Sequence, residues 1–125
     1  MPCKIIWEEM GILAFHSGTV TDEEVKAGND MMYGDKRFET IAYQISDYTE
    51  ATNIQITPRD AKVIGALDKT ASRWNRKKMR MAVVTKDEKF IPIVKTYFKE
   101  FEGTASECRI FESLDMAYNW VKSEY

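Results

Sequence analysis

Short apolar runs separated by polar turns mark the beginning of the chain. Cys3 to Trp7 is the first run, the sequence Glu-Glu-Met-Gly follows as a turn, and Ile12 to Ser17 is the second run. Two apolar runs joined by a short turn are typical of a β-hairpin. The pattern therefore predicts two antiparallel strands at the start of the chain.

The next segment has the pattern of a helix start. Thr21 precedes three acidic residues, and Glu24 stands three positions after it. That is the spacing of a capping box, in which the two side chains satisfy backbone N–H groups reciprocally. An apolar stripe follows, and Gly34 is a natural C-terminal stop. We therefore expect a helix between Thr21 and Gly34.

A strand and a second helix are expected on either side of a polar segment. Ile41 to Asp47 alternates between its two faces with the period of a strand. The hydroxyl and carboxylate groups that follow predict a polar loop up to Thr57. Thr57 and Pro58 suit the N-cap and the first position of a helix. Its predicted apolar stripe consists of Ala61, Ile64, Leu67, Ala71 and Trp74.

The rest of the chain continues the alternation of strands and helices. A uniformly apolar run within 79–85 predicts a strand covered on both faces, and residues 89–101 form an aromatic-rich helical stripe before Gly103. A strand over 107–111 and a helix capped by Ser113 complete the order β-β-α-β-α-β-α-β-α. This order predicts an α/β fold with a mostly parallel five-stranded sheet, an antiparallel N-terminal hairpin strand and about four helices. We expect one domain spanning residues 1–125.

Composition narrows the classes of partner. The 125 residues carry a formal net charge of −2 with 30% charged residues, so the chain lacks the basic excess of a general nucleic-acid binder. No apolar stretch approaches the ~18 residues that a membrane-spanning helix needs, so we expect no stable membrane insertion. The N-terminus lacks a basic region followed by a long apolar run, which predicts a cytoplasmic protein.

Candidate catalytic and metal-binding chemistry is sparse. The chain has two cysteines, Cys3 and Cys108, and one histidine, His16, which are too few for a four-ligand structural zinc site. We expect reduced cysteines, no metal and no cofactor. No nucleophile elbow, phosphate-binding glycine loop or zinc-protease motif occurs. An enzyme that used His16 and Asp47 would need the fold to bring the two side chains together.

Three segments carry a resemblance to a known family: ISDYT at 45–49, RMAVVT at 80–85 and ECRIFESLDMAYNWV at 107–121. With the order of elements, they resemble the STAS domain of bacterial anti-sigma-factor antagonists, and especially the divergent SpoIIAA-like (STAS/SEC14-type) branch of uncharacterised bacterial proteins. The resemblance spans nearly the whole chain. It implies a non-catalytic regulatory or binding module with a protein partner or a small apolar or amphipathic ligand.

The same resemblance points to site residues around the polar segment. In the antagonists a strand ends in Asp-x-Ser, and a kinase phosphorylates a serine at the start of the next helix. Asp47 and Thr49 match the first element, and the phosphorylated position falls on Thr57, although Ile56 and Pro58 depart from the pattern beside it. The resemblance therefore implies a ligand or partner site at Asp47, Thr49 and Thr57, with Thr57 as a candidate for phosphorylation.

Basic residues gather between 73 and 80. They are Arg73, Arg76, Lys77, Lys78 and Arg80. One interpretation is a helix C-terminus, where cations complement the dipole, followed by a solvated loop. The other is an anion patch for phosphate, anionic lipid or an acidic partner.

Aromatic residues gather on the predicted helix over 89–101. Phe90, Tyr97, Phe98 and Phe101 give this helix more aromatic surface than one buried stripe needs. Core packing is one explanation. The others are the wall of an apolar pocket and the interface of a homodimer that acts as an adaptor without a ligand.

Overall fold

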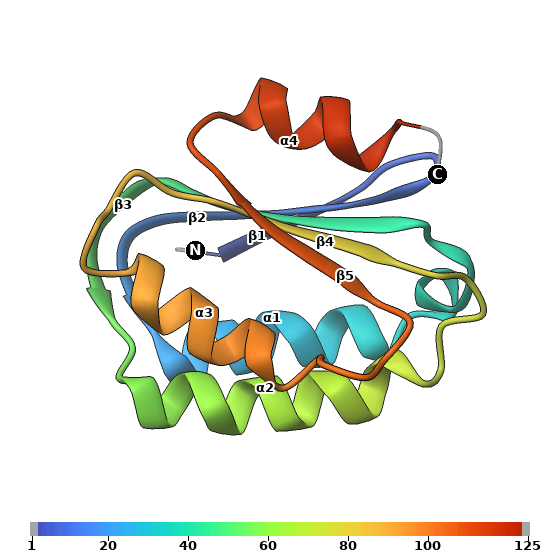
Figure 1. The fold of residues 1–125 in the computed structure, drawn as a ribbon, viewed down its shortest axis with the longest axis horizontal. Helices are drawn as coiled ribbons and strands as arrows, with labels where there is room; N and C mark the ends of the chain where they lie inside the picture. The colour runs from blue at the N-terminus through green and yellow to red at the C-terminus, as the bar shows by residue number, and fades with distance from the viewer. Residues whose placement is uncertain (1–2, 124–125) are drawn as a thin grey trace.

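The computed structural model describes residues 3–123, which form an α/β fold with five strands, four α-helices and one short 3₁₀ helix (Figure 1). In chain order these are β1 (Cys3–Trp7), β2 (Gly11–Thr21), α1 (Asp22–Tyr33), η1 (Lys36–Thr40), β3 (Tyr43–Gln55), α2 (Pro58–Ser72), β4 (Arg80–Val84), α3 (Ile91–Lys99), β5 (Glu107–Phe111) and α4 (Leu114–Val121).

The five strands form one mixed sheet in the order β1-β2-β3-β4-β5. β1 is antiparallel to β2, and every other neighbouring pair is parallel. Helices α1, α2 and α3 cover one face of the sheet, and α4 covers the other (Figure 1). The predicted fold class is therefore confirmed. No helix within residues 3–123 is long and apolar enough to cross a membrane.

Burial follows from this layered arrangement. All five residues of β4 are buried, because helices cover both faces of the central strands. Ile64, Phe90 and Val94 belong to the core on the side of α1–α3. Ile45 and Val84 pack with α4 on the opposite face.

The predicted N-caps Thr21, Thr57 and Ser113 are confirmed, whereas the helix predicted over 89–101 begins at Ile91. Thr57 and Asp60 form a reciprocal capping box: the Thr57 hydroxyl accepts from the Asp60 N–H at 3.1 Å, and the Asp60 carboxylate accepts from the Thr57 N–H at 2.9 Å. Pro58 occupies the first turn. At α1, the Thr21 hydroxyl accepts from the Glu24 N–H at 3.3 Å, but the return bond of the predicted capping box does not form, and Glu24 Oε2 is buried without a hydrogen-bond partner among residues 3–123.

The predicted polar loop after Asp47 is wrong, because β3 continues as a strand to Gln55. β2 is also longer than predicted, and its residues 17–21 pair with residues 50–55 of β3 through two register shifts. Gly18, with a φ of 63°, adopts the left-handed conformation beside the second shift. This ribbon extends past β1 and β4, so many of its polar side chains face solvent and its sequence resembles a loop.

The predicted apolar stripe of α2 is only partly correct. Leu67 and Trp74 are 55% and 59% exposed. The side of α2 that faces the protein carries Ala61, Ile64, Asp68 and Ala71. α2 also lies close to α3: a Cβ at Gly65 would stand 2.8 Å from Cγ of Glu100, so only glycine permits this approach.

Arg80 does not belong to the predicted surface patch. Its side chain is 5% exposed, and its Nη1 donates to the Trp120 carbonyl and to the carbonyl and hydroxyl of Ser123. The arginine emerges from buried strand β4 toward the end of α4, where unpaired helix carbonyls need donors. Arg80 therefore holds the C-terminal end of α4 against the sheet.

Candidate functional site

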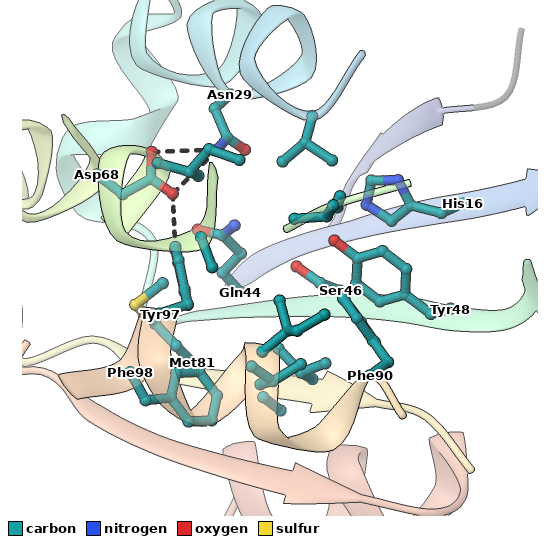
Figure 2. A pocket seen from close by; sticks show the side chains of 18 residues that line it. His16, Asn29, Gln44, Ser46, Tyr48, Asp68, Met81, Phe90, Tyr97 and Phe98 are labelled. Carbon is teal, nitrogen blue, oxygen red and sulfur yellow. Dashed lines mark hydrogen bonds between the residues drawn. The ribbon is translucent and has the colours of Figure 1, made fainter. Parts of the chain in front are cut away.

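A cavity of about 50 Å³ lies between the sheet and helices α1, α2 and α3 (Figure 2). Most of its lining is apolar and comes from α2, α3 and the central strands. The polar side chains on its wall are His16, Asn29, Gln44, Ser46, Tyr48, Asp68 and Tyr97.

Asp68 of α2 lies at one end of the cavity, between α1 and α3. The Asn29 amide of α1 donates to both carboxylate oxygens, at 3.1 and 3.0 Å, and the Tyr97 hydroxyl of α3 donates at 2.6 Å (Figure 2). One carboxylate therefore links the three helices that enclose the cavity.

The environment of Asp68 shifts its protonation. The side chain is 4% exposed, and burial raises its pKa to about 6, while the hydrogen bonds from Tyr97 and Asn29 oppose the shift. Burial also raises the pKa of Tyr97, and the Asp68 carboxylate adds to that effect. At pH 7 Asp68 is mainly ionised and receives its hydrogen bonds from neutral donors.

His16 and Tyr48 lie at the other end of the cavity. Their rings are stacked, with centroids 4.3 Å apart and planes 4° from parallel, and the Phe90 ring lies 4.7 Å from Tyr48. Burial lowers the pKa of His16 to about 4, against a smaller opposite effect of the Asp47 charge. His16 is therefore neutral at pH 7.

Two buried polar atoms of wall residues have no hydrogen-bond partner among residues 3–123: His16 Nδ1 and Gln44 Oε1. A buried polar atom without a partner costs about 1–3 kcal/mol. A cavity of this size is large enough for a water molecule and is roughly a third of the engineered apolar cavity that admits benzene. The wall thus has unused hydrogen-bonding capacity within an apolar lining.

Among residues 3–123, the cavity wall contains no lysine or arginine, and Asp68 is its one carboxylate. A negatively charged group inside would meet this carboxylate with no compensating cation. The electrostatics of the cavity therefore favour an uncharged occupant.

The residues proposed from the sequence for a ligand site do not line this cavity, and Thr57 lies away from the other two. Asp47 is buried, and its carboxylate accepts from the Thr49 N–H at 2.9 Å, while its neighbours Ser46 and Tyr48 line the cavity. Thr49 and Thr57 are exposed. Eight residues separate them, which is roughly 25 Å along an extended strand. Asp47 and Thr49 are thus in contact while Thr57 lies apart, and binding of a ligand or partner at these residues stays a prediction.

Phosphorylation of Thr57 stays a prediction. The Thr57 hydroxyl accepts from the Asp60 N–H within the capping box, and the Asp60 carboxylate lies next to it. A phosphate there would gain the helix dipole but would stand beside an existing carboxylate.

The fold separates the two residues of the enzyme hypothesis. Asp47 pairs with Phe15 in the sheet and so shares a face with it, whereas His16, the next residue, lines the cavity on the other face. His16 and Asp47 therefore do not form a catalytic pair.

Within residues 3–123, neither a disulfide nor a metal-binding cluster is formed. Cys3 and Cys108 are free thiols, both half-buried, and burial raises the pKa of Cys108 to about 12. Within this range no three His, Cys, Asp or Glu side chains are grouped to hold a metal ion.

Two of the remaining basic residues have acidic neighbours. Arg76 lies 3.5 Å from a Glu39 carboxylate oxygen, and Lys78 lies 3.7 Å from one of Glu107. Arg73 and Lys77 are exposed beyond the end of α2. Binding of an anion to this segment stays a prediction.

The aromatic side chains of the 89–101 segment point inward. Phe90 and Phe101 are 5% and 3% exposed, and Tyr97 and Phe98 are half-buried on the cavity wall. They supply the core and the cavity rather than an exposed aromatic surface. A homodimer through this helix stays a prediction, and these aromatic rings no longer motivate it.

The sequence interpretation missed the polar side chains of the cavity. Gln44 and Ser46 occupy a strand that a parallel sheet buries on both faces. Polar residues at such positions could have indicated a polar site within the core. Asp68 interrupts the inward stripe of α2 with a carboxylate, which was a second signal.

Comparison with known proteins adds one informative likeness. No family model matches the chain, and no curated protein matches it. A solved structure of an uncharacterised protein of the DUF3478 family with a SpoIIAA-like fold, from Shewanella loihica PV-4, aligns with a TM-score of 0.56 and 18% sequence identity, over 95% of this chain and 91% of that chain. Identity this low shows the fold alone. The chain has a SpoIIAA-like fold, as its sequence resemblance predicted.

Proposed function

We propose that this protein is a non-catalytic binding module that takes a small, uncharged amphipathic molecule into the cavity between the sheet and α1–α3. One observation carries the proposal: His16 Nδ1 and Gln44 Oε1, on residues that line a mainly apolar cavity, are buried polar atoms without partners among residues 3–123. Ligand sites typically combine apolar walls with a few polar groups that fix the orientation of the ligand.

The energetics favour an occupant that forms hydrogen bonds. Each unpaired polar atom costs about 1–3 kcal/mol, and a ligand hydroxyl or amide that reaches it recovers part of this cost. Contact with the apolar wall adds about 25 cal/mol for each Å² removed from water. In the absence of such a ligand, a water molecule can serve the same polar atoms.

The charges of the wall support an uncharged ligand. Asp68 would repel a carboxylate, and no cation on the wall would balance one. An alcohol or an amide is therefore favoured over a fatty acid of equal length. A ligand larger than a few heavy atoms requires the three helices to separate, since the cavity is about 50 Å³.

The chemistry of the polar groups supports a binding role rather than catalysis. His16 is neutral and stacked on Tyr48. Asp68 already accepts hydrogen bonds from Asn29 and Tyr97, which leaves it poorly placed to act as a base.

Matched alcohol and carboxylate probes test the proposal. Hexan-1-ol and decan-1-ol should raise the melting temperature and remain bound in native mass spectra, whereas hexanoate and decanoate should do neither. Ala61→Leu fills the cavity from α2 and should abolish the effect. Ala66→Leu is the control, because Ala66 lies on the exposed side of the same helix.

Three results would count against the cavity as a ligand site. They are a melting temperature that no alcohol or amide changes, carboxylates that bind as well as alcohols, and an alcohol effect that survives Ala61→Leu.

A further inference from the structure

The outer side of α2 carries a second apolar stripe that the cavity does not use. Val63, Leu67 and Trp74 are 44%, 55% and 59% exposed. The spacing of four residues places Val63 and Leu67 along one line of the helix, and Trp74 continues this line in the turn just beyond its end. Large apolar side chains gathered on a surface usually mark a contact with another molecule.

The stripe borders a groove between α1 and α2 of about 570 Å³. Leu67 and Trp74 form its wall on the α2 side, and Tyr33 contributes from α1. The two helices run side by side in the same direction (Figure 1), and the bond between Asn29 and Asp68 fixes their relative level.

The two helices that border the groove carry opposite charges. On α1, Glu23 and Asp30 are exposed, while Asp22 is paired with Lys26 at 3.4 Å. The acidic residues of α2 are Asp60, which forms the capping box, and Asp68, which is buried and bonded to Tyr97. The cationic residues of α2 and its C-terminal cap are Arg59, Lys62, Lys69 and Arg73. One edge of the face is thus acidic and the other basic.

We propose that this face binds a second copy of the same chain, through a two-fold axis that runs along the α1–α2 groove. Rotation about such an axis keeps each residue at its level and places α1 of one copy opposite α2 of the other. Glu23 then faces Lys62 of the second copy, and Asp30 faces Lys69 and Arg73. Each contact occurs twice, because a two-fold interface is self-complementary.

The charges also select this axis over its alternative. A two-fold axis across the groove would place α1 against α1 and α2 against α2. Glu23 and Asp30 would then face the same acidic helix, and the cations of α2 would face one another. Like charges in contact across an interface are costly, so only the axis along the groove combines attraction with burial of Leu67 and Trp74.

The size of the face predicts a weak dimer. α2 has 15 residues and is therefore about 22 Å long, and two helices side by side are about 20 Å wide, which gives a footprint of roughly 450 Å². A standard stable interface buries about 800 Å² on each partner. The dimer should therefore dissociate on dilution.

Analytical ultracentrifugation over a range of protein concentrations tests the proposal. The wild-type chain, of 14.5 kDa, should approach twice that mass at high concentration. Leu67→Glu should remain a monomer, since it buries a charge at the centre of the interface. Met116→Glu is the matched control, because Met116 is 54% exposed on α4, on the opposite side of the sheet, and this variant should dimerise normally.

A charge swap tests the geometry. Lys62→Glu should weaken the dimer by about tenfold, because it makes two symmetric pairs repulsive. Adding Glu23→Lys to the same chain should restore the affinity, and neither change alters a contact within one copy. Three outcomes would overturn the proposal. The wild type could be a monomer at every concentration, which would leave the face to a different partner. The Leu67→Glu variant could still dimerise, or the double variant could dimerise as weakly as Lys62→Glu alone.

Discussion

At the scale of single residues, the cavity contains two ionisable groups whose pKa values move in opposite directions. Burial raises the pKa of Asp68 to about 6 and lowers that of His16 to about 4. In the unfolded chain the corresponding values are about 3.9 and 6.5. As pH falls from 6.5 to 4, Asp68 takes up its proton at a higher pH in the folded state than in the unfolded state, which stabilises the fold. His16 takes up its proton at a higher pH in the unfolded state, which destabilises the fold. The two contributions nearly cancel.

Single substitutions should expose these hidden contributions. In Asp68→Asn only the histidine contribution remains. The free energy of unfolding of this variant, relative to that of the wild type, should therefore fall by about 2–3 kcal/mol as the pH is lowered from 6.5 to 4. His16→Phe keeps a stacking ring and should give the opposite slope. Urea titrations across this pH range measure both. Parallel slopes for the two variants would show that these groups do not have opposite shifts.

Gln44 provides a second test at the residue scale. Gln44→Met preserves the shape of the side chain and removes the unpaired buried acceptor, so the protein should gain about 1–2 kcal/mol of unfolding free energy. Gln55→Met, at an exposed position of the same strand, should change little. Chemical denaturation gives both values. A loss of stability in Gln44→Met would mean that a water or ligand already pairs with Oε1 in solution.

At the scale of the elements, α4 depends on one arginine. Arg80→Met would remove the buried charged donor shared by the Trp120 carbonyl and the carbonyl and hydroxyl of Ser123, leaving the Trp120 carbonyl only its bonds from Ser123, and should cost about 2–4 kcal/mol of unfolding free energy. Arg109→Met is the control, because Arg109 lies 5.1 Å from the Trp120 ring, as close as Arg80 at 5.2 Å, but is exposed. Equal losses in both variants would assign the effect to stacking on Trp120 rather than to the helix end.

Much of the element order could be predicted because its signals are local. Thr57 and Pro58 mark the start of a helix whatever surrounds them, since the capping groups lie within one turn. The length of β3 could not be predicted in this way. Residues 50–55 form a strand because β2 pairs with them, and their polar side chains fit the solvent on an open ribbon as well as they fit a loop.

The side of α2 that faces the protein illustrates a different difficulty. Leu67 and Asp68 both lie near the inward stripe of Ala61 and Ile64, and hydrophobicity alone favours Leu67. The structure buries Asp68 instead, because Asn29 and Tyr97 supply the donors that a buried carboxylate needs. Those donors come from other helices, so a single helical pattern contains no trace of them.

The candidate site could not be predicted from the sequence for the same reason. Its polar side chains come from β2, β3, α1, α2 and α3, and only the register of the sheet and the packing of the helices bring them together. The strand pattern did place Gln44 and Ser46 on one face. That pattern does not show that helices cover this face or that a cavity lies beneath them.

At the scale of the whole molecule, local stability should decrease from the central strands toward the open ribbon. β4 is buried throughout and lies between two strands. Residues 49–55 of β3 have β2 on one side, but β4 ends opposite Asp47, so their other edge is unpaired within residues 3–123. Amide exchange requires local opening, which costs least where contacts are fewest.

Hydrogen exchange within β3 therefore offers an internally controlled measurement. Amides of residues 43–47 should exchange far more slowly than those of residues 49–55, although all belong to one strand. The comparison needs no variant, because the two segments share the same protein, solvent and pH. Equal protection would contradict the open edge and would indicate that another chain covers the ribbon in solution, since an unpaired strand edge is a ready template for a further strand.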